Sequence, residues 1–447
     1  MKKRALSTTR IILIGFLITI LLGSLLLSLP ISSASKNPVP YIDALFTATT
    51  ATCVTGLVTV TTAHAWSFFG QAVILLLIQI GGLGVITIMS AFMIMLGKKI
   101  SLGNRMLIMD SFNLNSMSGL VQFIKKVVLG SLIIEAIGAL LYMLVFIPEF
   151  GLWGIWISVF NAVSAFCNAG MDIISESSLY NYVENPLINI VTSLLIIIGG
   201  LGFIVWWDII RILKNKHTRH FRYLTLHSKI VLTATLILIV SGAVLIFIFE
   251  YTNPLTIGNL SLSGKIQASL FQSITTRTAG FASVPQEHLT LPSVLICLLL
   301  MFIGGSPAGT AGGIKTVTFF VILCTAFSVI KGKRRVGAFN RSLSENAINK
   351  AMAVCTTSFI ILFVSTLMLS LCCNAPLTDI VYETVSATAT VGLSRNLTES
   401  LNLFGKIIIT ATMYFGRVGP ISFAIALGSG RENGNIVTDP IEEISVG

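Results

Sequence analysis

The chain has 447 residues, of which 54% are hydrophobic and 11% are charged, whereas soluble domains carry roughly 25% charged residues. This composition excludes a soluble globular protein and predicts a helical protein that crosses a membrane several times. The formal net charge of +11 would also suit a nucleic-acid-binding protein, but most of the 29 Lys and Arg residues fall in the two ends of the chain and in three connectors, at 98–126, 211–229 and 331–350. Such clustering is typical of cytoplasmic segments. We therefore interpret the charge as a consequence of membrane topology and expect no nucleic-acid partner.

Eight apolar segments are long enough to span a bilayer, which takes about 20 residues. In chain order they are residues 11–31, 71–97, 127–147, 188–213, 230–251, 291–330, 351–373 and 404–427. The first segment is longer than the core of a signal peptide, so we expect it to remain as an anchor. Residues 100–124 are expected to lie in the membrane interface as an amphipathic connector. Since the tails and the basic connectors share one side, we predict a multi-pass protein of the cell membrane with both termini in the cytoplasm.

A short segment that cannot cross the membrane lies within each pair of spans, and the four segments share one pattern. Each opens with small and apolar residues, passes through Ser, Thr, Asn or Cys, and ends on a glycine followed by Leu, Met or Phe. The four segments are DALFTATTATCVTGL (43–57), SVFNAVSAFCNAGM (158–171), ASLFQSITTRTAGF (268–281) and DIVYETVSATATVGL (379–393). We call them the pore units, and their glycines are Gly56, Gly170, Gly280 and Gly392.

The spacing around these glycines indicates true repetition. A second glycine cluster begins 24 to 29 residues after each of them, as Gly81-Gly82-Leu83-Gly84 does in the first repeat. Aligned on its aromatic residue, the third unit is about one residue shorter than the others. We predict an all-α polytopic membrane protein in which four pseudo-symmetric helix–pore loop–helix repeats, with eight spanning helices, surround a central pore. The repeats are expected at 1–97, 98–213, 214–330 and 331–447.

The ends of the pore units suit a monovalent cation. Backbone carbonyls can replace an ion's hydration shell where irregular backbone lines a polar cavity, and glycine allows the required backbone angles. Four helix C-termini of roughly −0.5 charge each add a partial charge of about −2. These ends hold no Asp or Glu, whereas a ring of carboxylates is typical of pores for divalent ions. The predicted ion-selectivity filter, which would hold the transported potassium, consists of Val54, Thr55, Gly56, Asn168, Ala169, Gly170, Thr278, Ala279, Gly280, Thr390, Val391 and Gly392.

The sixth span is predicted to be broken, because five glycines and a proline within ten residues do not form a stable helix. We expect an intramembrane loop below the filter, followed by Lys315, which could also snorkel. Arg417 falls in the matching part of the eighth span, and an arginine inside a membrane faces a cavity or a partner because burying it is costly. We predict that a gate is formed by Gly304, Gly305, Ser306, Pro307, Ala308, Gly309, Thr310, Ala311, Gly312, Gly313, Lys315 and Arg417.

Together, the four pore units, the sequence GGSPAGTAGGIK at 304–315 and Arg417 resemble the Trk/Ktr/HKT superfamily of potassium transporters. The resemblance covers nearly the whole chain and is greatest to the membrane (KtrB-like) subunit of bacterial Ktr systems. Trk-type subunits usually carry extra N-terminal spans, whereas ten residues precede the first span here, which favours Ktr.

The resemblance implies sodium-dependent potassium uptake, with potassium as the transported ion and sodium as an activator. It implies a homodimer with one pore per protomer, surrounded by membrane lipid and seated on a cytosolic ring of KtrA/KtrC-like nucleotide-binding subunits. It also implies the filter glycines named above, and glycine at all four positions goes with potassium preference. ATP is expected to bind the partner, since this chain has no GxxxxGK[ST] or GxGxxG signature and is expected to bind no cofactor.

The sequence can be compared with three other classes of protein. A TrkH-like or less selective sodium/potassium transporter stays open, because the residues before the filter glycines differ among the repeats. An alternating-access transporter would show two inverted halves with helices broken at matching depth, whereas we expect four parallel repeats with one badly broken helix. A membrane enzyme would need clustered His, Asp or Glu, and Glu135 and Asp208 are scattered and lack a His partner.

Overall fold

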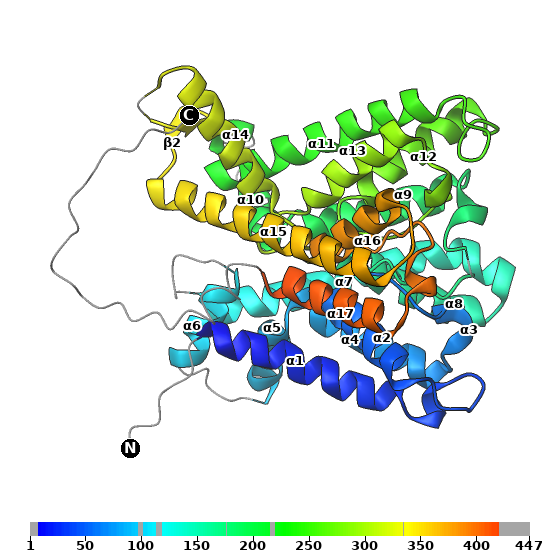
Figure 1. Cartoon of the computed structure of the whole chain (residues 1–447). Helices are drawn as coiled ribbons and strands as arrows, with labels where there is room; N and C mark the ends of the chain where they lie inside the picture. The colour runs from blue at the N-terminus through cyan, green and yellow to red at the C-terminus, as the bar shows by residue number, and fades with distance from the viewer. Residues whose placement is uncertain are drawn as a thin grey trace.

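The computed structural model describes residues 8–96, 102–112, 119–175, 177–214, 220–333 and 335–419. Over these residues the chain forms four units, each with a first helix, a shorter pore helix and a second helix (Figure 1). The first helices are α1 (Thr8–Leu27), α7 (Leu120–Phe150), α11 (Leu226–Glu250) and α15 (Glu345–Cys372). By length and composition, these are the four unbent helices of the described residues that could cross a membrane.

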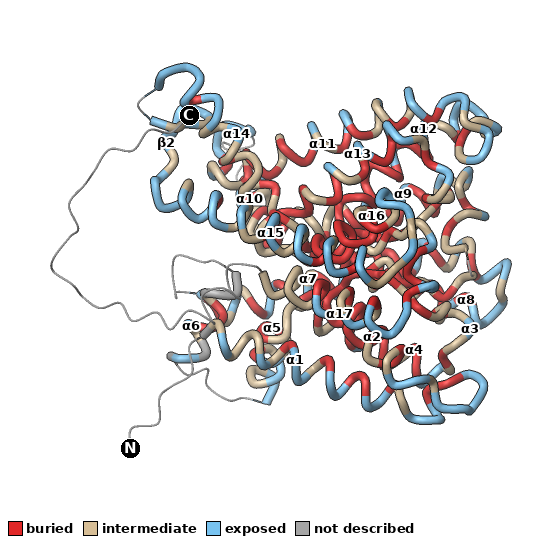
Figure 2. The backbone as a smooth tube through the Cα atoms, viewed as in Figure 1, coloured by how far each residue is buried: buried red, intermediate tan, exposed pale blue. Residues whose placement is uncertain are grey.

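The pore helices lie at the centre of the molecule and are too short to cross it. They are α2 (Tyr41–Cys53), α8 (Trp153–Cys167), α12 (Leu262–Thr275) and α16 (Leu377–Ala389). With 13 to 15 residues they span about 20 Å, less than the ~30 Å of a bilayer core. Figure 2 shows most of their length buried. The predicted arrangement of four helix–pore loop–helix repeats is confirmed.

The second helices are more broken than the sequence suggested. They are α4 (Phe68–Leu83) with α5 (Val85–Met95), α9 (Pro186–Gly200) with α10 (Phe203–Lys214), α13 (Leu291–Phe302) with α14 (Thr316–Ile330), and α17 (Leu403–Val418). The first two pairs bend by 98° at Gly84 and Gly202, whose φ angles are +88° and +90°. The expectation that only one second helix is badly broken is therefore wrong.

The break in each pair follows from the glycine cluster that the sequence showed. In GGLG, the last glycine adopts a positive φ that other residues resist, so the motif ends one helix and starts another. Gly419 has the same conformation, with φ +95°, and α17 ends just before it. The expected continuation of this span to residue 427 falls mostly outside the described residues.

The remaining elements are short connections. They are η1 (Pro30–Ser32), α3 (Thr62–Ala65), α6 (Leu102–Phe112), η2 (Tyr180–Tyr182), η4 (Phe221–Tyr223), η5 (Gln286–His288), the antiparallel strands β1 (Gly337–Ala338) and β2 (Arg341–Ser342), and η6 (Thr398–Ser400). Among the described residues of the predicted amphipathic connector at 100–124, residues 102–112 form α6, and α7 starts earlier than expected, at Leu120.

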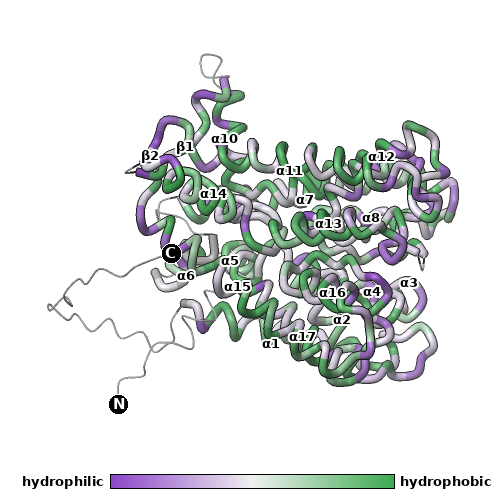
Figure 3. The backbone as a smooth tube through the Cα atoms, turned by 45° about the horizontal axis from the view of Figure 1, so that its top comes forward, coloured by the Kyte–Doolittle hydropathy of each residue, from purple (hydrophilic) through white to green (hydrophobic). Residues whose placement is uncertain are grey.

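The outer surface of the first helices is apolar. Large hydrophobic side chains such as Leu144 and Leu236 are about two-thirds exposed, at 65% and 64%. Figure 3 shows hydrophobic residues along the helices and hydrophilic residues concentrated at their ends and in the connections. Soluble proteins rarely expose so much continuous apolar surface, and lipid is the solvent that suits it.

Polar contacts link helices inside this apolar shell, both within a repeat and between repeats. Hydroxyl pairs link a first helix to a second helix in two repeats: Tyr142 with Thr192 at 2.6 Å and Ser365 with Thr412 at 2.8 Å. An ion pair of 2.5 Å joins Lys406 Nζ in the first turn of α17 to Asp43 Oδ1 in the first turn of α2. Since positive charge is unfavourable at a helix N-terminus, Asp43 compensates for the position of Lys406.

We expect Lys406→Met to lower the free energy of unfolding by roughly 3 kcal/mol, because the change leaves the Asp43 carboxylate largely buried without its cation. The melting temperature of the detergent-purified protein measures this loss. The double variant Asp43→Asn/Lys406→Met removes both charges and should recover most of the stability. A double variant no more stable than Lys406→Met would contradict this account.

Candidate ion pore

Each predicted filter triplet follows the C-terminal end of a pore helix. The first residue of the triplet has a left-handed backbone in all four repeats, with φ of +56° at Val54, +59° at Asn168, +68° at Thr278 and +51° at Thr390. The third residue is the glycine, whose φ lies between +66° and +102°. Residues other than glycine rarely adopt positive φ, so the surrounding packing must hold these four segments in place.

The third repeat differs, as its shorter sequence suggested. The pore helices of the other three repeats run directly into a left-handed first filter residue. In the third repeat α12 ends at Thr275, and its C-cap Thr276 keeps a right-handed backbone. Alignment on the glycines rather than on the aromatic residues is therefore the correct choice for the filter.

The four glycines close a ring. A methyl group built on Gly56 would lie 2.6 Å from the Ala169 carbonyl oxygen of the second repeat. In the same sense, a methyl on Gly170 would meet the Ala279 oxygen at 2.6 Å, one on Gly280 the Val391 oxygen at 2.5 Å, and one on Gly392 the Thr55 oxygen. The order runs from repeat one to four and back to one. This cyclic contact is direct structural support for a four-fold arrangement around an axis.

Backbone N–H groups of the triplets are occupied by their own pore helices. Thr55 N donates to Thr50 O at 2.9 Å, and Val391 N donates to Ser386 O at 2.8 Å. In the same two repeats the glycine N–H donates to the hydroxyl of that pore-helix residue, from Gly56 to Thr50 and from Gly392 to Ser386. Because the donors face the helices, the filter is rich in acceptor oxygens.

These oxygens suit a cation without a formal negative charge. The hydroxyl oxygens of Thr278 and Thr390 are buried and make no hydrogen bond within the described residues. Converging helix C-termini add partial negative charge. No group of three His, Cys, Asp or Glu side chains capable of holding a metal occurs in the described part of the chain. The arrangement therefore fits a weakly held monovalent ion better than a tightly coordinated divalent one.

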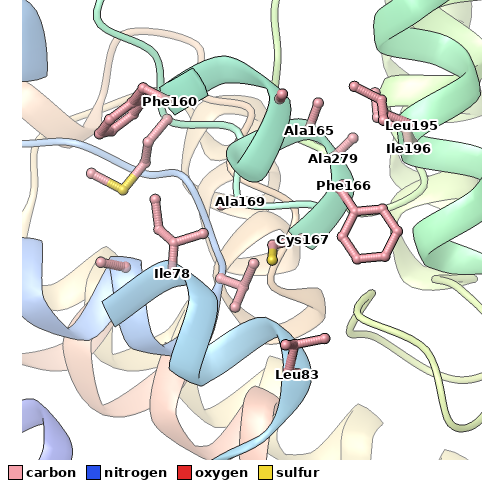
Figure 4. Packing of buried hydrophobic residues seen from close by; sticks show 14 of the residues in the cluster. Ile78, Leu83, Phe160, Ala165, Phe166, Cys167, Ala169, Leu195, Ile196 and Ala279 are labelled. Carbon is pink, nitrogen blue, oxygen red and sulfur yellow. The ribbon is translucent and has the colours of Figure 1, made fainter. Parts of the chain in front are cut away.

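Apolar packing supports the filter of the second repeat from behind. Figure 4 shows the end of α8 between residues of α4 and α9. The fully buried side chains at this contact are Ile78 of α4 and Phe166 and Cys167 of α8 itself. A methyl on Gly82 would lie 2.6 Å from Cys167 Sγ, so α4 approaches this end closely.

The glycine-rich loop Gly304–Gly313 fills the break in the second repeat's second helix. Ser306 N and Thr310 N donate to the Gly200 and Gly199 carbonyls, at 2.9 and 3.2 Å, and Phe203 N donates to Ala308 O at 2.8 Å. The broken helix has free carbonyls at the end of α9 and free N–H groups at the start of α10. The loop supplies partners for both, which explains how irregular backbone is tolerated at this depth.

The same loop lies against the filter. Thr310 Oγ1 lies 3.0 Å from Phe166 O and 3.1 Å from the Asn168 side-chain oxygen. Gly312 approaches the fourth repeat so closely that an added methyl would collide with Thr390 Oγ1. Asn168 and Thr390 are the first filter residues of their repeats, so the loop covers the helix-side end of the filter.

Arg417 connects the loop to the first repeat. Its Nη1 donates to Thr310 O and its Nη2 to Gly81 O, both at 2.6 Å. Gly81 lies in the last turn of α4, where carbonyls lack helical partners. Lys315 Nζ donates to Ala311 O at 2.6 Å, which favours its holding the loop over snorkelling. Arg417 is the second-last residue of α17, so it lies at the end of this helix, next to the loop.

Arg277 is a further residue at this site that the sequence pattern did not single out. It immediately precedes the third filter triplet, is 7% exposed, and Nη2 donates to Gly304 O at 3.3 Å. Thus two guanidinium groups bind the loop, one at its start and one at Thr310. A charged residue directly before a filter triplet is the signal that could have identified it.

The two carboxylates considered for an enzyme have separate structural partners. Glu135 accepts hydrogen bonds from the Gln79 side chain at 3.1 Å. Asp208 accepts from the backbone and hydroxyl of Thr225, at 2.9 and 2.8 Å, at the start of α11. Neither belongs to the filter or to the loop.

This fold and site define a class of protein: a helical membrane protein with an ion pore built from four pore loops. The sequence signature of the TrkH family, described as a cation transport protein, matches residues 3–437. The chain belongs to this family, whose members are ion transporters and not enzymes.

Several characterised proteins are similar along their whole length. The chain is 42% identical to "Ktr system potassium uptake protein B" of Bacillus subtilis, covering 96% of this chain and 94% of that protein. It is 40% identical to "Potassium/sodium uptake protein NtpJ" of Enterococcus hirae, covering 100% and 99%. Among solved structures, the potassium transporter TrkH from Vibrio parahaemolyticus matches with a TM-score of 0.76 at 16% identity, over 96% of this chain and 86% of that one. The last match shows the shared fold.

We expect Gly392→Ala to reduce monovalent cation flux by more than about 10-fold, because the added methyl must displace the Thr55 carbonyl and the φ of +98° is strained for alanine. Rubidium uptake into proteoliposomes measures the effect. The control is Gly130→Ala, whose new methyl would lie 3.6 Å from its nearest neighbour, Trp206. Equal flux in the two variants would contradict the tight ring.

Proposed function

We propose that this chain takes up potassium across the cell membrane through a channel-like pore. The observation that carries the proposal is the ring of four filter glycines, each packed against a carbonyl of the next repeat. Such a ring presents backbone oxygens to an ion on the axis, and it holds no carboxylate. The names of the Bacillus subtilis and Enterococcus hirae relatives support potassium as the substrate.

A less selective sodium/potassium transporter is the second candidate. The observation that favours it is the imperfect symmetry of the filter, whose first residues are Val54, Asn168, Thr278 and Thr390. The relative from Enterococcus hirae carries both ions in its name. An alternating-access mechanism draws some support from Gly84, Gly202 and Gly419, where second helices break in corresponding places. The four parallel repeats still favour a continuous pore.

We further propose that the glycine-rich loop, Lys315 and Arg417 form the gate. The loop lies against the filter residues Asn168 and Thr390, and Arg417 ties it to the carbonyl of Gly81. To let an ion pass, the loop would have to exchange these hydrogen bonds. At about 10 Å and an effective dielectric of about 20, the Arg417 charge also repels a monovalent cation by about 1.7 kcal/mol.

Regulation through other chains forms part of the proposal. We propose a homodimer that sits on a cytosolic nucleotide-binding ring, with sodium as an activating ion and both termini in the cytoplasm. The name of the Bacillus subtilis relative places that protein within a Ktr system, which supports a partner for this chain. The basic connectors, which include Lys229 and Lys331, favour the cytoplasmic side for the partner.

Rubidium uptake into proteoliposomes that contain the purified chain, with and without a cytosolic Ktr ring, tests the function. We expect uptake that potassium competes away more strongly than sodium does, and faster uptake at low than at zero sodium. Equal competition by the two cations would favour the less selective transporter. Absence of any monovalent cation flux under both conditions would refute the pore.

For the gate, we expect Arg417→Ala to raise rubidium flux in the absence of the ring by roughly 10-fold, because it removes charge-assisted hydrogen bonds that hold the loop. Arg341→Ala is the control, since it removes an equal charge from an exposed position in β2. Unchanged flux in Arg417→Ala would show that this residue does not gate.

A further inference from the structure

Two positions behind each filter are polar in all four repeats. The first follows the aromatic residue of the pore helix, and the second lies six residues after the filter glycine. The pairs are Thr47 and Thr62, Asn161 and Glu176, Gln272 and Gln286, and Glu383 and Thr398. All of them except residue 176, which lies outside the described residues, are buried. Buried polar groups are costly in a membrane protein. A polar pair that recurs at the same two positions therefore indicates a specific role.

In the fourth repeat the first member of the pair is a carboxylate, and it holds the segment that follows the filter. Glu383 is fully buried. One of its oxygens accepts from Ser394 Oγ at 2.7 Å, and the other accepts from Thr398 Oγ1. Ser394 stands two residues after the filter glycine, and Thr398 opens η6. The carboxylate therefore joins the pore helix to the chain that leaves the filter, at two points.

In the third repeat two glutamines make the same connection. Gln272 Nε2 donates to Gln286 Oε1 at 2.7 Å, and Gln286 Nε2 donates back to Gln272 Oε1 at 3.2 Å. Gln286 opens η5, just as Thr398 opens η6. The hydroxyl of Tyr382, which precedes Glu383, donates to Gln286 Oε1 at 2.9 Å. The connection thus continues from one repeat to the next.

Arg395 links the fourth repeat to the third on the side of the filter away from the glycine-rich loop. Its Nε lies 2.7 Å from Asp379 Oδ1 at the start of α16, and its two terminal nitrogens donate to the carbonyls of Gln286 and Glu287 at 2.7 and 3.0 Å. One side chain of the fourth repeat therefore holds the segment that follows the filter in the third repeat. Charge-assisted hydrogen bonds of this kind are stronger and more directional than neutral ones.

We propose that a network of six residues sets the cation selectivity of the filter by holding the segments that follow two of its four triplets. We call it the backing network, and it consists of Gln272, Gln286, Tyr382, Glu383, Ser394 and Thr398. The inference rests on the proposed function, since it concerns the ions that pass the same filter. Selection among similar ions depends on where the coordinating oxygens are held. A network in which every member has a partner gives such a site rigidity. These residues are positioning residues, because none belongs to the filter triplets.

The key variant is Glu383→Leu, which keeps the approximate size of the side chain and removes both hydrogen bonds. We expect sodium to compete with rubidium uptake roughly 2- to 10-fold better than in the parent chain, the change that corresponds to about one lost hydrogen bond. The maximal rubidium rate should change less than the ratio of inhibition constants. Glu383→Gln retains an acceptor and should restore part of the selectivity, which a merely structural loss of stability would not predict.

The matched control is Glu250→Leu, which makes the same change at another buried glutamate. Glu250 is also buried and also accepts hydrogen bonds from hydroxyls, those of Thr256 and Thr290 at 2.6 and 2.7 Å, but it lies at the end of α11, outside the pore units. It should leave sodium competition unchanged. If Glu383→Leu does not accumulate, the double variant Ser394→Ala/Thr398→Val removes the two donors instead and carries the same expectation.

The outcomes separate the two proposals. Rubidium uptake by the parent chain with unaltered sodium competition in Glu383→Leu, or in the double variant, refutes the backing network and leaves the proposed function intact. Absence of uptake by the parent chain refutes both. A loss of selectivity in Glu250→Leu as large as that in Glu383→Leu would show a general effect of buried carboxylates and would also overturn the inference.

Discussion

The structure depends on one constraint: a membrane pore for a bare cation needs irregular backbone, and irregular backbone needs partners for its polar groups. Each of the four filter segments meets this constraint in the same way. Its N–H groups turn to the pore helix, as Thr55 and Val391 show, and its glycine packs against a carbonyl of the neighbouring repeat. The ring is thus stabilised by the helices behind it and by contacts between neighbouring repeats.

The broken second helices follow the same constraint. A break exposes carbonyls on one side and N–H groups on the other. The break near Gly202 is satisfied by the glycine-rich loop of the next repeat, and the carbonyl of Gly81 is satisfied by Arg417. The third repeat therefore completes the second, and the fourth repeat completes the first.

The four repeats differ in the charged and polar residues that they place near the filter and the loop. Arg277 and Arg417 come from the third and fourth repeats, and both bind the loop. The acid Glu383 and the glutamine pair Gln272–Gln286 also belong to these repeats. A pore of four identical chains would have to repeat every charge around the axis. A single chain with four repeats can place an arginine in one repeat without copying it into the other three. Four copies of the same guanidinium around the axis would repel a cation much more strongly.

The sequence by itself determined the membrane class, the four repeats and the four glycines that the structure brings into one ring, because hydrophobic length and glycine spacing are local patterns. It also predicted a loop at Gly304–Gly313, since that composition cannot stay helical. Only the tertiary structure decided that Gly84 and Gly202 are breaks, because the sequence GGLG alone also suits close packing of helices. It likewise decided the partners of Arg417, the place of Arg277 and the closure of the ring. These depend on contacts between residues such as Gly81 and Arg417, which are 336 positions apart in the chain, and no local pattern records which distant carbonyl a side chain will reach.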